Sequence, residues 1–195
     1  MIRLGFIGCG NIARKGHIEP TLRHLEDVEL VAFYDVRTLA AEECAALYGG
    51  AVCRSLRELV EMGLDAAYIC IPPDAHGPAE RALIQARIPF FVEKPIHLDL
   101  QEAIELAHRI EDQGLITAVG YHFRYLPLTQ RVREALQSRQ VVLTHAFWLQ
   151  GTPALEFNLS FRRSGGQVVE QVTHWLDCSA TPWGKWWKSR PATTA

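Results

Sequence analysis

Two glycines and an acid near the start of the chain have the residue types and spacing of a site for a phosphate-containing ligand. Gly8 and Gly10 follow the apolar run 2–7, and Asp35 follows a second apolar run, 28–34. Gly8 permits a tight turn, and Gly10 has no side chain to keep a phosphate from the backbone. The order of strand, glycine turn, helix, strand and acid predicts a dinucleotide-binding unit.

Residues beside the turn extend this prediction. Asn11 and Ile12 open the helix, whose free N–H groups and positive dipole end favour the phosphates, and Ala13 lets helix and strand pack closely. Asp35 can accept hydrogen bonds from both ribose hydroxyls, which favours NAD. Arg37 is close enough to receive a 2′-phosphate, so NADP stays open. The alternative is a plain β-turn-α unit that holds no cofactor.

The elements that must position these residues alternate along the first 120 residues. Apolar runs predict strands at 2–7, 28–34, 51–53, 65–71, 88–92 and 115–119. Helices are predicted at 37–48, 55–62, 75–86 and 99–113, with Ser55–Glu58 and Asp99–Glu102 as helix caps. Strands that read as continuous apolar runs indicate a parallel sheet covered on both faces. The predicted fold class is α/β, a Rossmann-type doubly wound sheet.

The pattern changes after residue 120, where we place a domain boundary. A helix is predicted from 128 to 137 and a longer strand of mixed polarity from 141 to 150. After a loop, Gly165 and Gly166 lead into an apolar helix. The first domain, 1–120, would bind the dinucleotide, and residues 121–177 would begin a second domain.

Composition narrows the function classes. The 195 residues are 48% hydrophobic and 22% charged, with a net charge of −2, so no nucleic-acid partner is indicated. No apolar run reaches membrane-spanning length, and the start reads as a core strand rather than a signal peptide. Five cysteines without CxxC spacing favour reduced thiols in the cytoplasm and no metal site.

Three further motifs stand out. They are Ile71-Pro72-Pro73-Asp74-Ala75-His76 and Glu93-Lys94-Pro95, each at the end of a predicted strand, and the segment 170–177. Ligands bind at the carboxyl ends of parallel strands, so the first two motifs lie on the edge that carries the glycine turn. Together with the segment 120–127, their order and spacing resemble the glucose–fructose oxidoreductase/inositol dehydrogenase (Gfo/Idh/MocA) family over residues 1 to about 177.

The resemblance implies an NAD(P)-dependent oxidoreductase that transfers a hydride between nicotinamide and a secondary alcohol or ketone of a sugar, polyol or related compound. It implies cofactor contacts from the two strand-end motifs, at Pro72, Pro73, His76, Glu93 and Lys94. It also implies that the second domain is the start of a truncated α+β domain for substrate binding and oligomerisation. The full-length form would be a homo-oligomer, and the shortened chain would turn over poorly.

Catalytic roles also come from the resemblance. Lys94 would contact the substrate oxygen, and His174 would be the general acid/base, with Glu170 four residues earlier to orient its imidazole. Substrate contacts would come from Lys94 and His174 and also from Tyr121, Arg124 and Asp177. The family commonly has Asp where this chain has Glu170 and Gly where it has Val172.

Two other functions stay open on this fold. Some relatives cleave glycosides with tightly held NAD, and others are nucleotide-binding regulators without catalysis. Retention of NAD without net NADH production would indicate the hydrolase. Cofactor binding that survives loss of both Lys94 and His174, together with a protein partner, would indicate the regulator.

The last segment, 178–195, departs from the family and is predicted to be a frameshifted tail. Trp has only the codon TGG, so a shifted frame forces Val at Trp186–Trp187 and Glu at Trp187–Lys188. Permitted codons elsewhere complete Leu-Arg-Tyr-x-Leu-Gly-Glu-Val-Val-Glu, which resembles the usual continuation of the family. A genuine short variant is the alternative, and sequencing the locus distinguishes the two.

Overall fold

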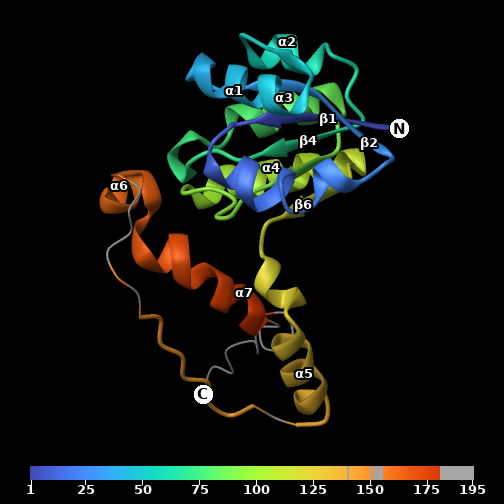
Figure 1. Cartoon of the computed structure of the whole chain (residues 1–195). Coiled ribbons are helices and arrows are strands. Elements are labelled where there is room, and N and C mark those ends of the chain that lie inside the picture. The colour runs from blue at the N-terminus through green and yellow to red at the C-terminus, as the bar shows by residue number, and fades with distance from the viewer. Residues whose placement is uncertain (140, 150, 152–155, 181–195) are drawn as a thin grey trace. The chain divides into compact units, whose positions relative to one another are not determined.

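The computed structural model describes residues 1–139, 141–149, 151 and 156–180 (Figure 1). The chain divides into two compact units, Met1–Gly120 and Tyr121–Ala195, and each is described by itself. The first unit contains six strands: β1 (Ile2–Ile7), β2 (Val28–Tyr34), β3 (Ala51–Val52), β4 (Ala66–Ile69), β5 (Phe90–Val92) and β6 (Thr117–Val119).

The six strands form one sheet in the order β3-β2-β1-β4-β5-β6, and every neighbouring pair is parallel. The chain first adds strands on one side of β1 and then returns to add the rest on the other side. This reversal defines the switch point of a doubly wound sheet, next to which ligands bind at the carboxyl ends of the strands. The predicted Rossmann-type α/β class is confirmed.

Helices connect the strands in the first unit: η1 (Ile12–Ile18), η2 (Leu22–His24), α1 (Thr38–Tyr48), α2 (Leu56–Val60), η3 (Pro73–Ala75), α3 (Pro78–Ala86) and α4 (Leu100–Gln113). Both predicted caps are confirmed. The amide of Glu58 donates to the Ser55 hydroxyl at 3.1 Å, and the amide of Glu102 donates to the Asp99 carboxylate at 3.0 Å. These bonds satisfy N–H groups that have no partner within a helix.

Helices cover both faces of the sheet (Figure 1) and enclose two apolar cores. One core packs α2, α3 and α4 against the sheet, and the other packs η1, η2 and α1. Four aromatic rings follow one another across β2, β1, β4 and β5 on the second face, at Phe33, Phe6, Tyr68 and Phe91. Adjacent ring centroids lie 5.9, 5.0 and 5.0 Å apart. We call these four residues the aromatic row.

Helices make up the described regular structure of the second unit: η4 (His122–Tyr125), α5 (Pro127–Leu136), η5 (Glu156–Leu159), α6 (Phe161–Ser164), η6 (Val168–Val172) and α7 (Thr173–Ala180). The predicted strand at 141–150 is wrong, because residues 141–149 form no strand. A run of mixed polarity forms a stable strand only when a neighbour pairs with its backbone, and the described residues of this unit supply no such neighbour.

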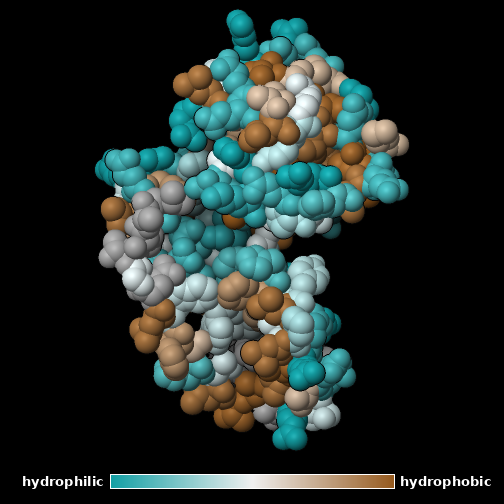
Figure 2. Space-filling view, viewed as in Figure 1, coloured by the Kyte–Doolittle hydropathy of each residue, from teal (hydrophilic) through white to brown (hydrophobic). Residues whose placement is uncertain are grey.

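Apolar side chains are exposed on the second unit, and brown surface gathers there in Figure 2. Val142, Leu143, Phe147 and Leu149 are each at least 79% exposed. Among the described helices of the whole chain, none has the length and apolar character needed to cross a membrane.

The prediction of a frameshifted tail falls mainly on residues 181–195, outside the described residues, while Cys178 still belongs to α7.

Candidate cofactor and catalytic site

The glycine turn after β1 has two glycines with different surroundings. Gly8 has φ +88°, and a Cβ there would lie 2.3 Å from the carbonyl oxygen of Cys70 at the end of β4. Its amide donates to the carbonyl of Tyr34 at 2.8 Å, which closes the turn against the end of β2. A Cβ at Gly10 would meet no atom within 4 Å in the part of the chain that the structure describes. Gly8 is therefore required by the fold, whereas Gly10 leaves open space beside the turn.

Asp35 is fixed by the same turn. Its Oδ2 accepts the amide N–H of Cys9 at 2.8 Å, and its Oδ1 accepts the amide N–H of Arg37 at 2.8 Å. The guanidinium of Arg37 lies 3.8 Å from Oδ1 and is 74% exposed, while the Asp35 side chain is 9% exposed. A carboxylate has about four acceptor positions, so both oxygens keep a lone pair for ribose hydroxyls.

The Cys9 side chain within the turn is buried and faces Cys44 of α1. The Cys44 thiol donates to the Cys9 carbonyl at 3.8 Å. A side-chain hydrogen bond between the Cys9 and Cys44 thiols and burial both raise the pKa of the Cys9 thiol, so it stays protonated at neutral pH. A protonated buried thiol is a poor nucleophile, and Cys9 has no chemical role in the site.

After β4, a buried histidine–glutamate pair begins α3. His76 Nδ1 and Glu80 Oε1 are 2.6 Å apart, and the Gly77 amide donates to Glu80 Oε2 at 2.6 Å. Burial opposes ionisation of Glu80, but the hydrogen bonds from His76 and the backbone outweigh it and lower the pKa of Glu80. His76 Nε2 is buried and has no hydrogen-bond partner among the described residues. His76 and Pro73, predicted cofactor contacts, thus lie at the carboxyl edge of the sheet.

After β5, Glu93 and Lys94 lie on the same edge, and the Lys94–Pro95 peptide bond is cis. Glu93 Oε1 is 2.8 Å from Nε2 of His17 on η1. Glu93 Oε2 accepts the amide N–H of Lys94 at 3.2 Å. The sheet therefore places the glycine turn, Asp35 and both strand-end motifs on one edge, as the sequence predicts.

In the second unit, His174 on α7 is buried among aromatic rings of η4 and the residue before it. Its ring stacks on Phe123 at a centroid distance of 4.5 Å and lies edge-on to His122 at 4.7 Å. The Tyr121 ring lies 6.2 Å away, and its hydroxyl accepts a hydrogen bond from Thr173 at 3.2 Å. The predicted acid/base is thus held in one orientation by ring packing.

Other predicted site residues of this unit are also fixed. Arg124 donates from Nε to Asp177 Oδ2 at 2.9 Å and from Nη2 to Asp177 Oδ1, a two-pronged pair that raises the pKa of Arg124. Glu170 is buried on η6, a π-helical turn that continues into α7, and accepts a hydrogen bond from Gln171. The pairing of Glu170 with His174 stays a prediction.

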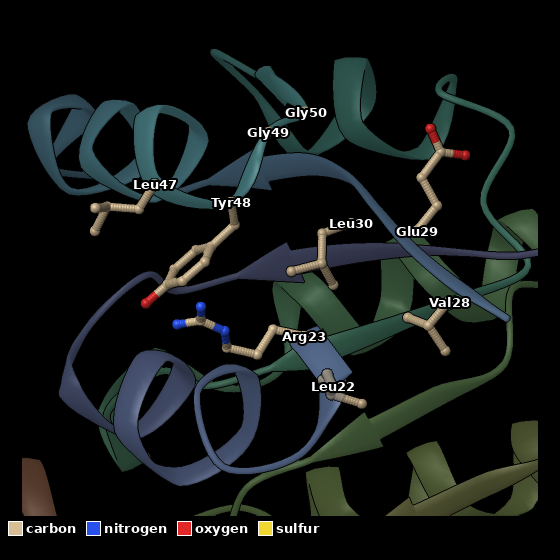
Figure 3. A pocket seen from close by; sticks show the side chains of 9 residues that line it. All are labelled: Leu22, Arg23, Val28, Glu29, Leu30, Leu47, Tyr48, Gly49 and Gly50. Carbon is tan, nitrogen blue, oxygen red and sulfur yellow. The ribbon is translucent and has the colours of Figure 1, made fainter. Parts of the chain in front are cut away.

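A hollow of about 410 Å³ lies elsewhere on the first unit, between η2, β2 and the end of α1 (Figure 3). It is lined by residues at the start of β2, Val28 to Leu30, and by Tyr48 and its neighbours. Val28 to Leu30 lie at the start of β2, whereas the glycine turn adjoins the other end of this strand. The hollow is therefore separate from the predicted cofactor edge.

Several residues that support the site were not among those predicted from the sequence. His17 pairs with Glu93 across 76 residues, a separation that leaves no local pattern. Glu80 was detectable, because it lies four residues after His76, the same helical spacing that linked Glu170 to His174. Packing of Phe123 on His174 depends on the fold of the second unit and has no signal in the sequence alone.

The residues present fit a dinucleotide. Open space at Gly10, a carboxylate held by two amides at Asp35 and the buried, unpartnered Nε2 of His76 lie along one edge of the sheet. Fold and site together define a nucleotide-binding α/β protein. Residues 2–121 match the oxidoreductase family with an NAD-binding Rossmann fold, and the chain belongs to this Gfo/Idh/MocA family.

Individual relatives agree with this assignment. The chain is 28% identical over 181 residues to inositol 2-dehydrogenase of Rhizobium meliloti and 26% identical over 186 residues to D-glucoside 3-dehydrogenase of Escherichia coli. These matches cover 90% and 91% of this chain but 53% of each relative. The crystal structure of a putative myo-inositol dehydrogenase from Sinorhizobium meliloti is similar with a TM-score of 0.76 and 27% identity, over 94% of this chain and 56% of that one. The chain therefore spans about half the length of these relatives.

Proposed function

We propose that the protein transfers a hydride between a nicotinamide and a secondary alcohol or ketone of a sugar, polyol or related compound. The observation that carries this proposal is the glycine turn locked to Asp35, with open space at Gly10. The named activities of the relatives on inositol and a glucoside support the substrate class. The first unit would supply the cofactor site.

NAD would be held by the turn and by the acid after β2. The backbone from Gly8 to Ile12 would face the pyrophosphate, and Asp35 would accept hydrogen bonds from the ribose hydroxyls. The negative charge of Asp35 would repel the 2′-phosphate of NADP, which favours NAD. Arg37 is exposed beside Asp35 and would offset part of that repulsion, so some use of NADP is compatible with the site.

The nicotinamide, when bound, supplies the hydride acceptor, and this chain's residues would handle the oxygen and its proton. Lys94 would stabilise negative charge on the reacting oxygen, and His174 would take the hydroxyl proton as a general base. Glu170 would stabilise the charged imidazole. Arg124 and Asp177 would contact substrate hydroxyls as one hydrogen-bonded pair.

Two experiments test the proposal. Calorimetric titration of the 195-residue chain with NAD and NADH measures the cofactor site directly, and we expect saturable binding of both. A screen of polyols and sugars with a chain repaired at the predicted frameshift then measures NADH production. Absence of NAD binding to the chain would remove the basis of the proposal. NAD that stays bound without net NADH production would favour the hydrolase, and NAD binding that survives loss of both Lys94 and His174, together with a protein partner, would favour the regulator.

A further inference from the structure

His17 is not part of any motif discussed above, yet its side chain reaches the strand-end motif that carries Lys94. It lies on η1, the helix that follows the glycine turn, and its side chain is 19% exposed. The ring sits over the aromatic row, 5.2 Å from Tyr68 and 5.0 Å edge-on to Phe91. This packing aims Nε2 at Glu93, one residue beyond β5.

The Glu93 carboxylate contacts both His17 and the backbone of Lys94. Its side chain is 13% exposed, and its two oxygens have different partners: Oε1 lies 2.8 Å from His17 Nε2, and Oε2 accepts the Lys94 amide N–H at 3.2 Å. A Cβ at Gly120 would lie 3.0 Å from Oε2, so the backbone after β6 also packs on this carboxylate. The Glu93 backbone is fixed too, because its amide donates to Ile69 at 2.9 Å.

We propose that His17 and Glu93 are positioning residues, whose pair fixes the Lys94 turn to the helix that begins at the glycine turn. Neither side chain needs to touch the substrate. Their relevance to the reaction rests on the proposed function, since Lys94 is there the residue that meets the reacting oxygen. The pair links the part of the fold that would hold the pyrophosphate to the part that would carry the chemistry.

The rate of hydrogen exchange at the Lys94 amide in the cofactor-free chain measures directly how firmly the backbone at Lys94 is held. The chain contains four lysines, so selective ¹⁵N-lysine labelling gives a simple spectrum. His17→Phe keeps a ring over the aromatic row and removes the contact with Glu93. Glu93→Ala removes the carboxylate itself. We expect Lys94 exchange to accelerate by about tenfold in each, the size expected for one hydrogen bond to a charged group.

Three further variants separate positioning from general loosening. His17→Gln keeps an N–H that can reach Glu93, and we expect it to restore slow exchange. Tyr48→Phe removes a different 2.8 Å bond, from the Tyr48 hydroxyl to Glu19 at the end of η1, and should leave Lys94 unchanged. The double variant His17→Phe/Glu93→Ala should exchange no faster than Glu93→Ala, because both changes break the same link.

Lysine acetylation, read by mass spectrometry with and without NADH, separates the two proposals. Protection of Lys94 by NADH in the wild type and its loss in His17→Phe would support both. Faster exchange in the variants without NADH protection in the wild type would support the positioning pair and contradict the proposed cofactor site. Wild-type exchange at Lys94 in both His17→Phe and Glu93→Ala would overturn the positioning pair, whether or not NADH binds.

Discussion

The amide of Cys9 donates a 2.8 Å hydrogen bond to Oδ2 of Asp35, so the acid after β2 is part of the glycine turn after β1. The amide of Arg37 holds the other oxygen at the same distance. These two bonds orient the carboxylate before any ligand arrives, which reduces the ordering cost of binding. The acid thus supports the turn, and both of its oxygens keep acceptor positions for a ligand.

Changing Asp35→Ser tests the ribose assignment. We expect NAD binding to weaken by about 1–3 kcal/mol, because charge-assisted hydrogen bonds are lost. NADP should lose much less, since its 2′-phosphate no longer faces the negative charge. Calorimetric titration of both cofactors measures the difference. Equal losses for NAD and NADP would contradict the assignment, and Arg37→Ala, which should weaken NADP alone, is the matched control.

The same substitution, glycine to alanine, should affect the stability of the first unit very differently at the two positions of the glycine turn. Gly8→Ala places a Cβ against Cys70 at positive φ, and we expect it to destabilise the first unit by about 2 kcal/mol or more. Gly10→Ala meets no neighbour and should change stability by no more than about 0.5 kcal/mol.

Ligand binding should separate the same two variants. Gly10→Ala should weaken NAD binding by at least about 1.4 kcal/mol, a factor of ten, because its methyl group occupies the space beside the turn. Urea unfolding followed by circular dichroism and calorimetric NAD titration measure the two effects. A Gly10→Ala chain that binds NAD as the wild type does would show that the pyrophosphate does not approach this residue.

The buried pair of His76 and Glu80 predicts a pH dependence of stability. The pKa of Glu80 is lowered in the folded chain, so its ionised form stabilises the fold at pH values above the unfolded pKa near 4.5. That stabilisation is lost as the pH falls from about 4.5 through the lower folded value. Glu80→Gln lacks this contribution, so the gap in stability between wild type and variant should narrow on acidification. A gap that is constant from pH 7 to about pH 3 would contradict the assignment.

In a chain repaired at the predicted frameshift, loss of Lys94 or His174 should reduce turnover far more than NAD affinity. Positioned acid/base groups contribute about 10²–10⁴ in rate, so each Ala variant should fall by that order. The double variant should cost less than the product of the single ones if the two groups act on one oxygen, as the proposed function requires. Turnover and NAD binding are measured for each variant across pH.

Each single variant carries its own signature. The residual rate of His174→Ala should rise with pH as hydroxide replaces the base, and Glu170→Gln should be milder because it keeps a hydrogen-bonding group. If Lys94→Ala keeps near-normal turnover and loses only NAD affinity, Lys94 belongs to the cofactor site alone.

Local pattern was sufficient to predict most of the first unit. The strands have continuous apolar runs, and Ser55 and Asp99 cap their helices through bonds three residues away, so short windows contain the needed information. At 141–150 a run of mixed polarity indicated a strand, and residues 141–149 form none. A strand depends on a paired neighbour, which no short window contains.

Some residues of the candidate site could be predicted from the sequence, and others could not. Gly8 and Asp35 were predictable because the turn and the acid have fixed positions around two strands. The partner of Glu93 was not, because His17 reaches it only once η1 packs on the aromatic row. Contacts set by tertiary packing have no counterpart in residue spacing.

The division of the chain after Gly120 also decides how its unfolding is observed. All five tryptophans, at 148, 175, 183, 186 and 187, belong to the second unit, and the first contains none. Indole emission therefore reports the second unit alone, whereas the parallel sheet would unfold without an indole signal. Tyr34, Tyr48 and Tyr68 are the native chromophores of the first unit, and a single tryptophan introduced there would give it an emission of its own.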